Sequence, residues 1–132
     1  LLAAEELAKE KVQARVLNVH TIKPIDEDAV LHAAHDTGAI VTAEEHQITG
    51  GLGSAVAEVL CTHLPVPIER VGVHDRFGES GTADALLDKY GLRAKDIVAA
   101  VQRVLERKGR KMKIFKPSHA DVRKATRKPR QP

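Results

Sequence analysis

Apolar residues along this chain form two patterns, short aliphatic runs and longer stretches in which they recur every three or four positions. The short runs have the length of buried β-strands and predict strands at residues 14–19, 39–43 and 68–73. The longer stretches predict helices at residues 1–11, 26–36, 53–63, 83–90 and 94–107. Strands that alternate with helices indicate βαβ units, so we predict an α/β fold with a mostly parallel sheet covered on both faces.

Residue types that favour helix ends support several of these boundaries. Asp26 is a common N-cap residue, and it follows the step Lys23-Pro24, which disfavours helix at Lys23. Gly38 can adopt the left-handed conformation that ends a helix. Thr82 can cap the helix at residues 83–90.

Composition limits the class of protein. The chain has 132 residues, enough for one domain, and its apolar content of 42% includes only two Phe, one Tyr and no Trp. This aliphatic composition argues against modules that stack nucleobases on aromatic rings. Cys61 is the single cysteine, which excludes an internal disulfide and a cysteine-based zinc site and favours an intracellular location. No apolar run approaches the roughly 20 residues of a membrane span, and we see no secretory signal.

Charge divides the chain into two parts. Residues 1–106 hold 10 Lys and Arg against 17 Asp and Glu, whereas residues 107–132 hold 11 Lys and Arg against Asp121 alone, giving the net charge of +3. The acidic part is typical of a globular body and the basic part of an exposed tail. Such a tail could bind nucleic acid or another polyanion, but charge runs of this kind are more often only solvated.

The segment EEHQITGGLGSAV, residues 44–56, raises the possibility of a phosphate site. Gly51 and Gly53 lie between a predicted strand and a predicted helix, where a helix N-terminus can bind phosphate. However, Val56 replaces the third glycine of the G-x-G-x-x-G pattern, and no P-loop Lys-Ser/Thr follows. A tight corner needs the same glycines, so we favour a structural role for Gly50–Gly53 and expect positive φ or a close backbone contact at Gly51 or Gly53.

Glu44, Glu45 and His46 lie at the carboxyl end of a predicted strand, where open α/β sheets tend to bind ligands. Adjacent strand residues point to opposite faces, so Glu44 and Glu45 do not enter one pocket unless the strand has already ended. We therefore favour a hydrogen bond that ties the strand end to the glycine loop over an acid–base role.

Two further candidates have weaker support. His32 and His35 have the i, i+3 spacing that could bind a metal, but no third ligand is placed beside them, so a polar helix face is favoured. Cys61 lies within a predicted helix without an evident basic neighbour, so we predict a buried, inert thiol.

In sequence order, four segments closely resemble the C-terminal domain of transketolase: ARVLNVHTIKPIDEDAV, AIVTAEEHQITGGLGSAVAEVL, VGVHDRFGESGTADALLDKYGL and DIVAAV. The FGESG form is similar to that of transketolases split into two polypeptides. The resemblance covers about residues 1–107. The related 1-deoxy-D-xylulose-5-phosphate synthase and the β-subunits of 2-oxoacid dehydrogenases have looser versions of this domain.

This resemblance implies a three-layer α/β/α sandwich around a five-stranded mixed sheet. It also implies that thiamine diphosphate and a divalent cation, Mg²⁺, lie between two other domains, which supply the catalytic residues. No catalytic, cofactor-binding or metal-binding residue is therefore carried over to this chain, and the chain alone is predicted to be inactive. The implied partners are the remaining transketolase domains or subunit, within a cytoplasmic homodimer, and neither a membrane nor nucleic acid is expected as a partner.

One departure from the family pattern concerns the sheet. In the family, a central strand precedes the helix at residues 1–11 and lies between the strands that correspond to residues 14–19 and 39–43. This strand and the antiparallel edge strand are absent here, so we expect a fragment in which residues 1–107 form the domain without its first strands. Residues 108–132 are expected to form a flexible basic tail.

These observations predict the non-catalytic C-terminal domain of a transketolase, which transfers two-carbon ketol units between sugar phosphates. One alternative is the corresponding domain of another thiamine-dependent enzyme such as the deoxyxylulose-phosphate synthase. The other is a stand-alone binding module that uses its basic tail.

Overall fold

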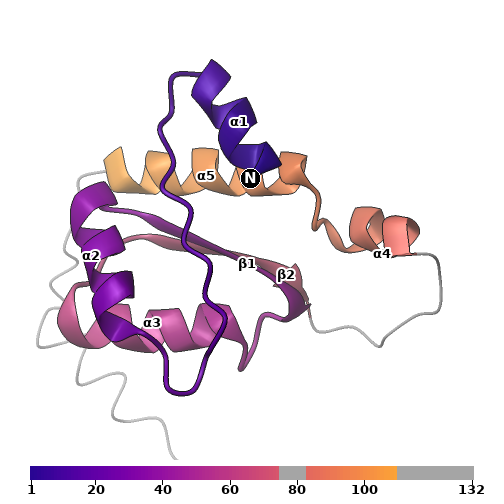
Figure 1. The fold of residues 1–132 in the computed structure, drawn as a ribbon. Helices are drawn as coiled ribbons and strands as arrows, with labels where there is room; N and C mark the ends of the chain where they lie inside the picture. The colour runs from indigo at the N-terminus through magenta and orange to yellow at the C-terminus, as the bar shows by residue number, and fades with distance from the viewer. Residues whose placement is uncertain (75–82, 110–132) are drawn as a thin grey trace, which may run out of the picture.

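The computed structural model describes residues 1–74 and 83–109 (Figure 1). Within these ranges, helices and strands follow one another in the order α1 (Leu2–Lys9), α2 (Glu27–Thr37), β1 (Ile40–Gln47), α3 (Leu52–His63), β2 (Ile68–Val73), α4 (Ala83–Tyr90) and α5 (Ala94–Gly109). The predicted cap at Thr82 and most of the predicted tail, from residue 110 onward, lie outside the described residues.

The two strands form a parallel pair joined by the crossover helix α3. Ile40 lies opposite Ile68 and Ala43 opposite Val71, and the register becomes irregular between Ala43 and Gln47. Parallel strands connected through a helix are the βαβ unit that the alternating apolar pattern predicts. The strand predictions at residues 39–43 and 68–73 are therefore confirmed, although β1 continues to Gln47.

Helices cover both faces of this pair (Figure 1). Helix α3 packs on β1 with α2 beside it, whereas α5 packs on both strands from the opposite face and carries α1 on its outer side. On the face covered by α2 and α3, one core cluster consists of buried Val30, Ala34, Val56, Val59 and Leu60. The predicted three-layer α/β arrangement is thus confirmed.

A second group of buried residues joins α1 to α5. Ala3 and Leu7 of α1 are buried, as are Ala100 and Val104 of α5. Leu7 is 2% exposed, and burial of a leucine side chain contributes about 1.5–3 kcal/mol to stability. Apolar burial therefore holds α1 in place, although the helix has no side-chain cap at its N-terminus.

Helix α2 has the ends that its sequence predicts. Asp26 Oδ1 accepts a hydrogen bond of 3.0 Å from Ala29 N, which satisfies one of the free N–H groups of the first turn. Gly38 has φ of 65° and donates its N–H to Ala34 O at 2.7 Å, so the helix ends in a left-handed glycine.

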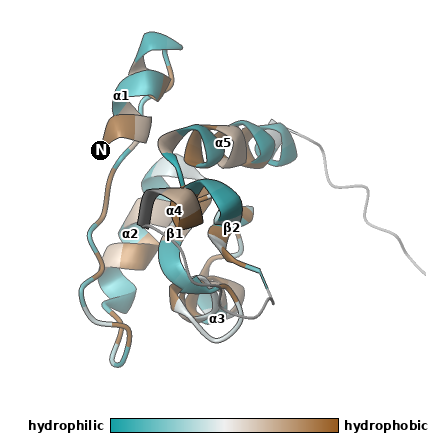
Figure 2. Ribbon diagram, turned by 90° about the vertical axis from the view of Figure 1, so that its right-hand side faces the viewer, coloured by the Kyte–Doolittle hydropathy of each residue, from teal (hydrophilic) through white to brown (hydrophobic). Residues whose placement is uncertain are grey.

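The strand predicted at residues 14–19 is wrong. This part of the chain is extended but forms no strand, and within the described ranges no backbone hydrogen bond joins residues 13–25 to another residue. Val16 and Leu17 are 56% and 40% exposed. Figure 2 shows the segment on one side of the molecule, with β1 between it and β2. An aliphatic run becomes a strand only when a neighbouring strand satisfies its N–H and C=O groups, and no described residue provides one here.

Candidate functional site

The glycine corner between β1 and α3 is the site that the sequence singled out. Glu44 of β1 places its carboxylate at the N-terminus of α3, where Oε2 accepts from Leu52 N at 2.8 Å and Oε1 accepts from Gly53 N at 2.9 Å. A negative charge is favourable here because the first N–H groups of a helix have no partner within the helix. The hydrogen bond expected between the strand end and the glycine loop is therefore present.

The glycines of the corner are needed for two different reasons. A Cβ on Gly51 would lie 2.8 Å from Gln47 O and would collide with the Glu44 carboxylate, while a Cβ on Gly53 would lie 2.9 Å from Thr42 Oγ1. The expected close contact at Gly51 is thus confirmed. The left-handed conformation occurs instead at Gly50, with φ of 79°, whereas Gly51 has φ of −94°.

Further polar contacts tie the corner to its surroundings. Gly50 N donates to Ser54 Oγ at 2.9 Å, Ser54 Oγ donates to Ile48 O at 3.2 Å, and Arg70 Nη1 donates to the same carbonyl at 3.1 Å. Thr42 Oγ1 is buried below Gly53 without a hydrogen-bond partner among the described residues. Every one of these contacts fixes the loop, and none leaves an acid and a base facing each other.

The neighbours of Glu44 do not complete an acid–base site. Glu45 and His46 are exposed, and His46 Nδ1 lies 3.0 Å from Gln47 O. Glu44 is engaged with α3 rather than with either of them. The side chains of Glu44, Glu45 and His46 therefore do not form one site, although the residues are consecutive in the sequence.

The histidine and cysteine candidates lie on helix surfaces. His32 and His35 are exposed on α2, and His35 Nδ1 lies 3.4 Å from Asp36 Oδ1. Across residues 1–74 and 83–109, no three His, Cys, Asp or Glu side chains gather as metal ligands would. The prediction that Cys61 is buried is wrong: the core of α3 is formed by Val56, Val59 and Leu60, and Cys61 points away from it into solvent.

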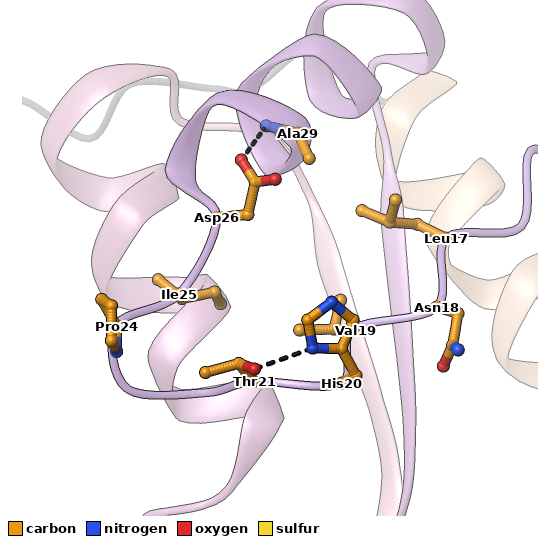
Figure 3. A pocket seen from close by; sticks show the side chains of 9 residues that line it. All are labelled: Leu17, Asn18, Val19, His20, Thr21, Pro24, Ile25, Asp26 and Ala29. Carbon is orange, nitrogen blue, oxygen red and sulfur yellow. Dashed lines mark hydrogen bonds between the residues drawn. The ribbon is translucent and has the colours of Figure 1, made fainter.

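A hollow of about 360 Å³ lies between the extended segment and the first turn of α2 (Figure 3). No pattern in the sequence indicated this hollow. Its lining consists of Leu17, Asn18, Val19, His20, Thr21, Pro24, Ile25, Asp26 and Ala29. His20 Nδ1 lies 2.8 Å from Thr21 Oγ1, and Asp26, the one carboxylate of the lining, is turned into the helix cap. Because Asp26 is engaged in the helix cap and most of the lining is apolar, the described residues of this hollow do not form an acid–base site.

Comparison with known proteins identifies the class. The family model for the C-terminal domain of transketolase matches residues 1–97, and the chain belongs to this family. The 6-deoxy-6-sulfo-D-fructose transketolase subunit SqwH of Clostridium sp. (strain MSTE9) is 60% identical over 108 residues, which are 82% of this chain and 34% of that protein. The 1-deoxy-D-xylulose-5-phosphate synthase 1 of Geobacter sulfurreducens is 41% identical over 111 residues, covering 83% of this chain and 17% of that protein.

A solved structure agrees with the sequence comparison. A chain described as a split gene transketolase, inactive beta4 tetramer, superposes with a TM-score of 0.77 at 55% identity and covers 80% of this chain and 34% of its own length. The chain therefore spans about a third, or less, of the relatives that it matches.

The family implies thiamine diphosphate, but the glycine corner does not fit a diphosphate group. The two N–H groups that would bind a phosphate at α3 already donate to Glu44, and a Glu44 carboxylate beside a diphosphate would repel it.

No helix among the described residues is both long and apolar enough to span a membrane.

Proposed function

We propose that this chain is the non-catalytic C-terminal domain of a transketolase, the enzyme class that transfers two-carbon ketol units between sugar phosphates. The match of residues 1–97 to the family carries this proposal. The occupied N-terminus of α3 supports it, because the one glycine-rich turn of phosphate-site type in the described chain is closed by Glu44.

The cofactor belongs to other parts of the whole enzyme in this proposal. Thiamine diphosphate, held there with Mg²⁺, supplies the nucleophile that accepts the two-carbon unit from the donor ketose. This chain contributes no catalytic, cofactor-binding or metal-binding residue. Its role is to pack against the remaining domains or subunit and to support a homodimer of the complete enzyme in the cytoplasm. The relative named as a transketolase subunit supports an association of this kind.

We further propose that residues 1–107 are one domain whose sheet is completed by strands outside the described chain. Three observations on the described residues support this: β2 is the one strand paired with β1, residues 13–25 have no backbone hydrogen-bond partner, and Val16 and Leu17 of that segment are exposed. A strand between residues 14–19 and β1 would satisfy both unpaired backbones at once.

A second candidate is the corresponding domain of a 1-deoxy-D-xylulose-5-phosphate synthase, because several relatives of that name match nearly the same region at 36–41% identity. The transketolase subunit is favoured by its 60% identity over a similar length.

Calorimetric titration of this chain with thiamine diphosphate and Mg²⁺ tests the proposal, and we expect no saturable heat and no ketol transfer. The complete enzyme, assayed with a ketose phosphate donor and an aldose phosphate acceptor, should be active. Saturable binding of the cofactor to this chain alone would refute the non-catalytic assignment, and a complete enzyme that makes deoxyxylulose phosphate instead would establish the second candidate.

A further inference from the structure

Exposed large apolar side chains gather on one side of the described molecule. Leu105 of α5 is one of them, and all the others belong to the first 22 residues: Leu1, Leu2, Val16, Leu17 and Ile22. Figure 2 shows the N-terminus and the extended segment along the same side, away from β2. We call the surface formed by residues 1–2 and 12–22 the apolar side. Single exposed apolar residues are ordinary, whereas a group of them marks an interaction surface.

The apolar side is also poor in charge. Residues 12–22 contain no Lys, Asp or Glu, and their single arginine, Arg15, is paired with Asp36 of α2 at 2.7 Å. Helix α5, by contrast, carries Lys95, Asp96, Arg103, Glu106, Arg107 and Lys108. Removing charged groups from water is costly, and the buried centre of a protein–protein interface is depleted in them. Covering residues 12–22 would therefore desolvate one arginine, which already has an acidic partner.

Backbone groups on this side lack partners. Within the described ranges, residues 13–25 make no backbone hydrogen bond, and β2 is the one strand paired with β1. Another extended chain satisfies such backbone groups most completely. Leu17 of the same segment also lines the hollow of about 360 Å³, whose lining is mostly apolar (Figure 3). The apolar side therefore provides free backbone donors and acceptors next to an apolar recess.

We propose that the remaining domains or subunit of the enzyme dock on the apolar side through an extended segment with aliphatic side chains. This inference rests on the proposed function, which supplies the occupant: the chain spans 34% of the similar transketolase subunit, so a protein of that kind has further parts to place here. A second copy of the described residues is a poor occupant, because it presents the same two unpaired backbones and no strand to insert between them. In this assembly, α5 keeps its charged surface in solvent.

Cysteine labelling tests this surface. Leu2→Cys, Val16→Cys and Ile22→Cys are each made in a Cys61→Ser background, because Cys61 is exposed. The rate of modification by a maleimide is measured in the 132-residue chain and in the complete enzyme. Each introduced cysteine should react about tenfold or more slowly in the complete enzyme, because an interface core excludes solvent. Lys95→Cys, at a side chain of α5 that is 73% exposed, is the control and should react equally fast in both.

Circular dichroism checks that each variant is folded, and ketol transfer by the complete enzyme is measured on the same samples. Protection of the three cysteines without ketol transfer would support the docking surface and refute the proposed reaction. Ketol transfer without protection would overturn the docking surface and leave the proposed function in place.

Two further results would overturn the docking surface. Equal protection of Lys95→Cys would show that assembly slows labelling everywhere. Protection that appears in the 132-residue chain alone, and grows with its concentration, would identify a second copy as the occupant.

Discussion

Lys108 Nζ donates a hydrogen bond of 2.7 Å to the carbonyl oxygen of Thr37, across 71 positions of the sequence. Thr37 is the last residue of α2, where free carbonyl groups and the helix dipole favour a positive charge. The stem of the same lysine lies close to Gly38, since a Cβ on that glycine would be 3.1 Å from Lys108 Cε. The last turn of α5 therefore closes α2 from the opposite face of the sheet.

Replacing Lys108 should loosen this closure. Lys108→Ala is expected to lower the free energy of unfolding by about 0.5–1 kcal/mol, because it removes both the hydrogen bond and the favourable charge at the helix end. Urea denaturation measures the change. Lys95→Ala is the matched control on the same helix, and an equal loss in both variants would show that Lys108 contributes only as a general surface charge.

Glu44 is expected to be the most important polar side chain of the glycine corner. Glu44→Ala should destabilise the fold by about 1–2 kcal/mol, because it leaves the N–H groups of Leu52 and Gly53 without their acceptor. The midpoint of chemical denaturation measures this. Glu45→Ala removes the neighbouring, exposed carboxylate and should stay within about 0.5 kcal/mol of the parent protein. Reversal of that order would contradict the capping role.

The glycines of the corner should differ in their tolerance. Gly51→Val should be the most damaging substitution, since its side chain would meet a backbone carbonyl as well as the Glu44 carboxylate. Overpacking of this kind costs about 1–3 kcal/mol. Gly50→Ala has open space and loses only the left-handed conformation, at about 1–2 kcal/mol. Thermal melting distinguishes them, and an unchanged melting temperature for Gly51→Val would refute the tight-corner account.

The ion pairs of Glu69 predict a dependence of stability on acid pH. Partial burial by itself would raise the pKa of Glu69, but hydrogen bonds from Arg107 and Arg103 outweigh it, so the pKa lies below its ordinary value of 4.5. Because the folded pKa is depressed, the stabilising contribution is present above about pH 4.5 and is lost as pH falls through the folded pKa.

Stability curves of the parent protein and Glu69→Gln, measured between neutral and strongly acid pH, should therefore converge at the acid end. Asp88→Asn is a suitable comparison, because Asp88 is exposed and its pair with Arg93 is screened by solvent. A constant difference between the parent protein and Glu69→Gln at all pH values would show that the carboxylate charge is not responsible.

The sequence contained enough information for those parts of the fold that local rules determine. Asp26 and Gly38 mark the ends of α2 because capping depends on residues within one turn. The parallel pairing of β1 with β2 follows from the aliphatic runs on either side of a helix. The role of Glu44 was expected only in outline, because a hydrogen bond between residues eight positions apart depends on how the loop folds back.

Other features depend on contacts between residues far apart in the sequence and could not be predicted from local sequence patterns. Residues 14–19 have the composition of a buried strand, yet strand formation requires a neighbour that local sequence does not specify. The exposure of Cys61 depends on the rotation of α3 about its axis, which the packing of Val59 and Leu60 decides. The hydrogen bond from Arg70 Nη1 to Ile48 O, 22 positions away, depends on tertiary packing alone.

The free edge of β1 has a consequence for handling the protein. Among residues 1–74 and 83–109, no strand pairs with β1 on the side of exposed Val16 and Leu17, so this edge is a template onto which another extended chain can add. In the cell, assembly with the remaining parts of the proposed enzyme would cover this edge. In vitro, the same edge favours concentration-dependent aggregation, which the substitution Val16→Lys should suppress.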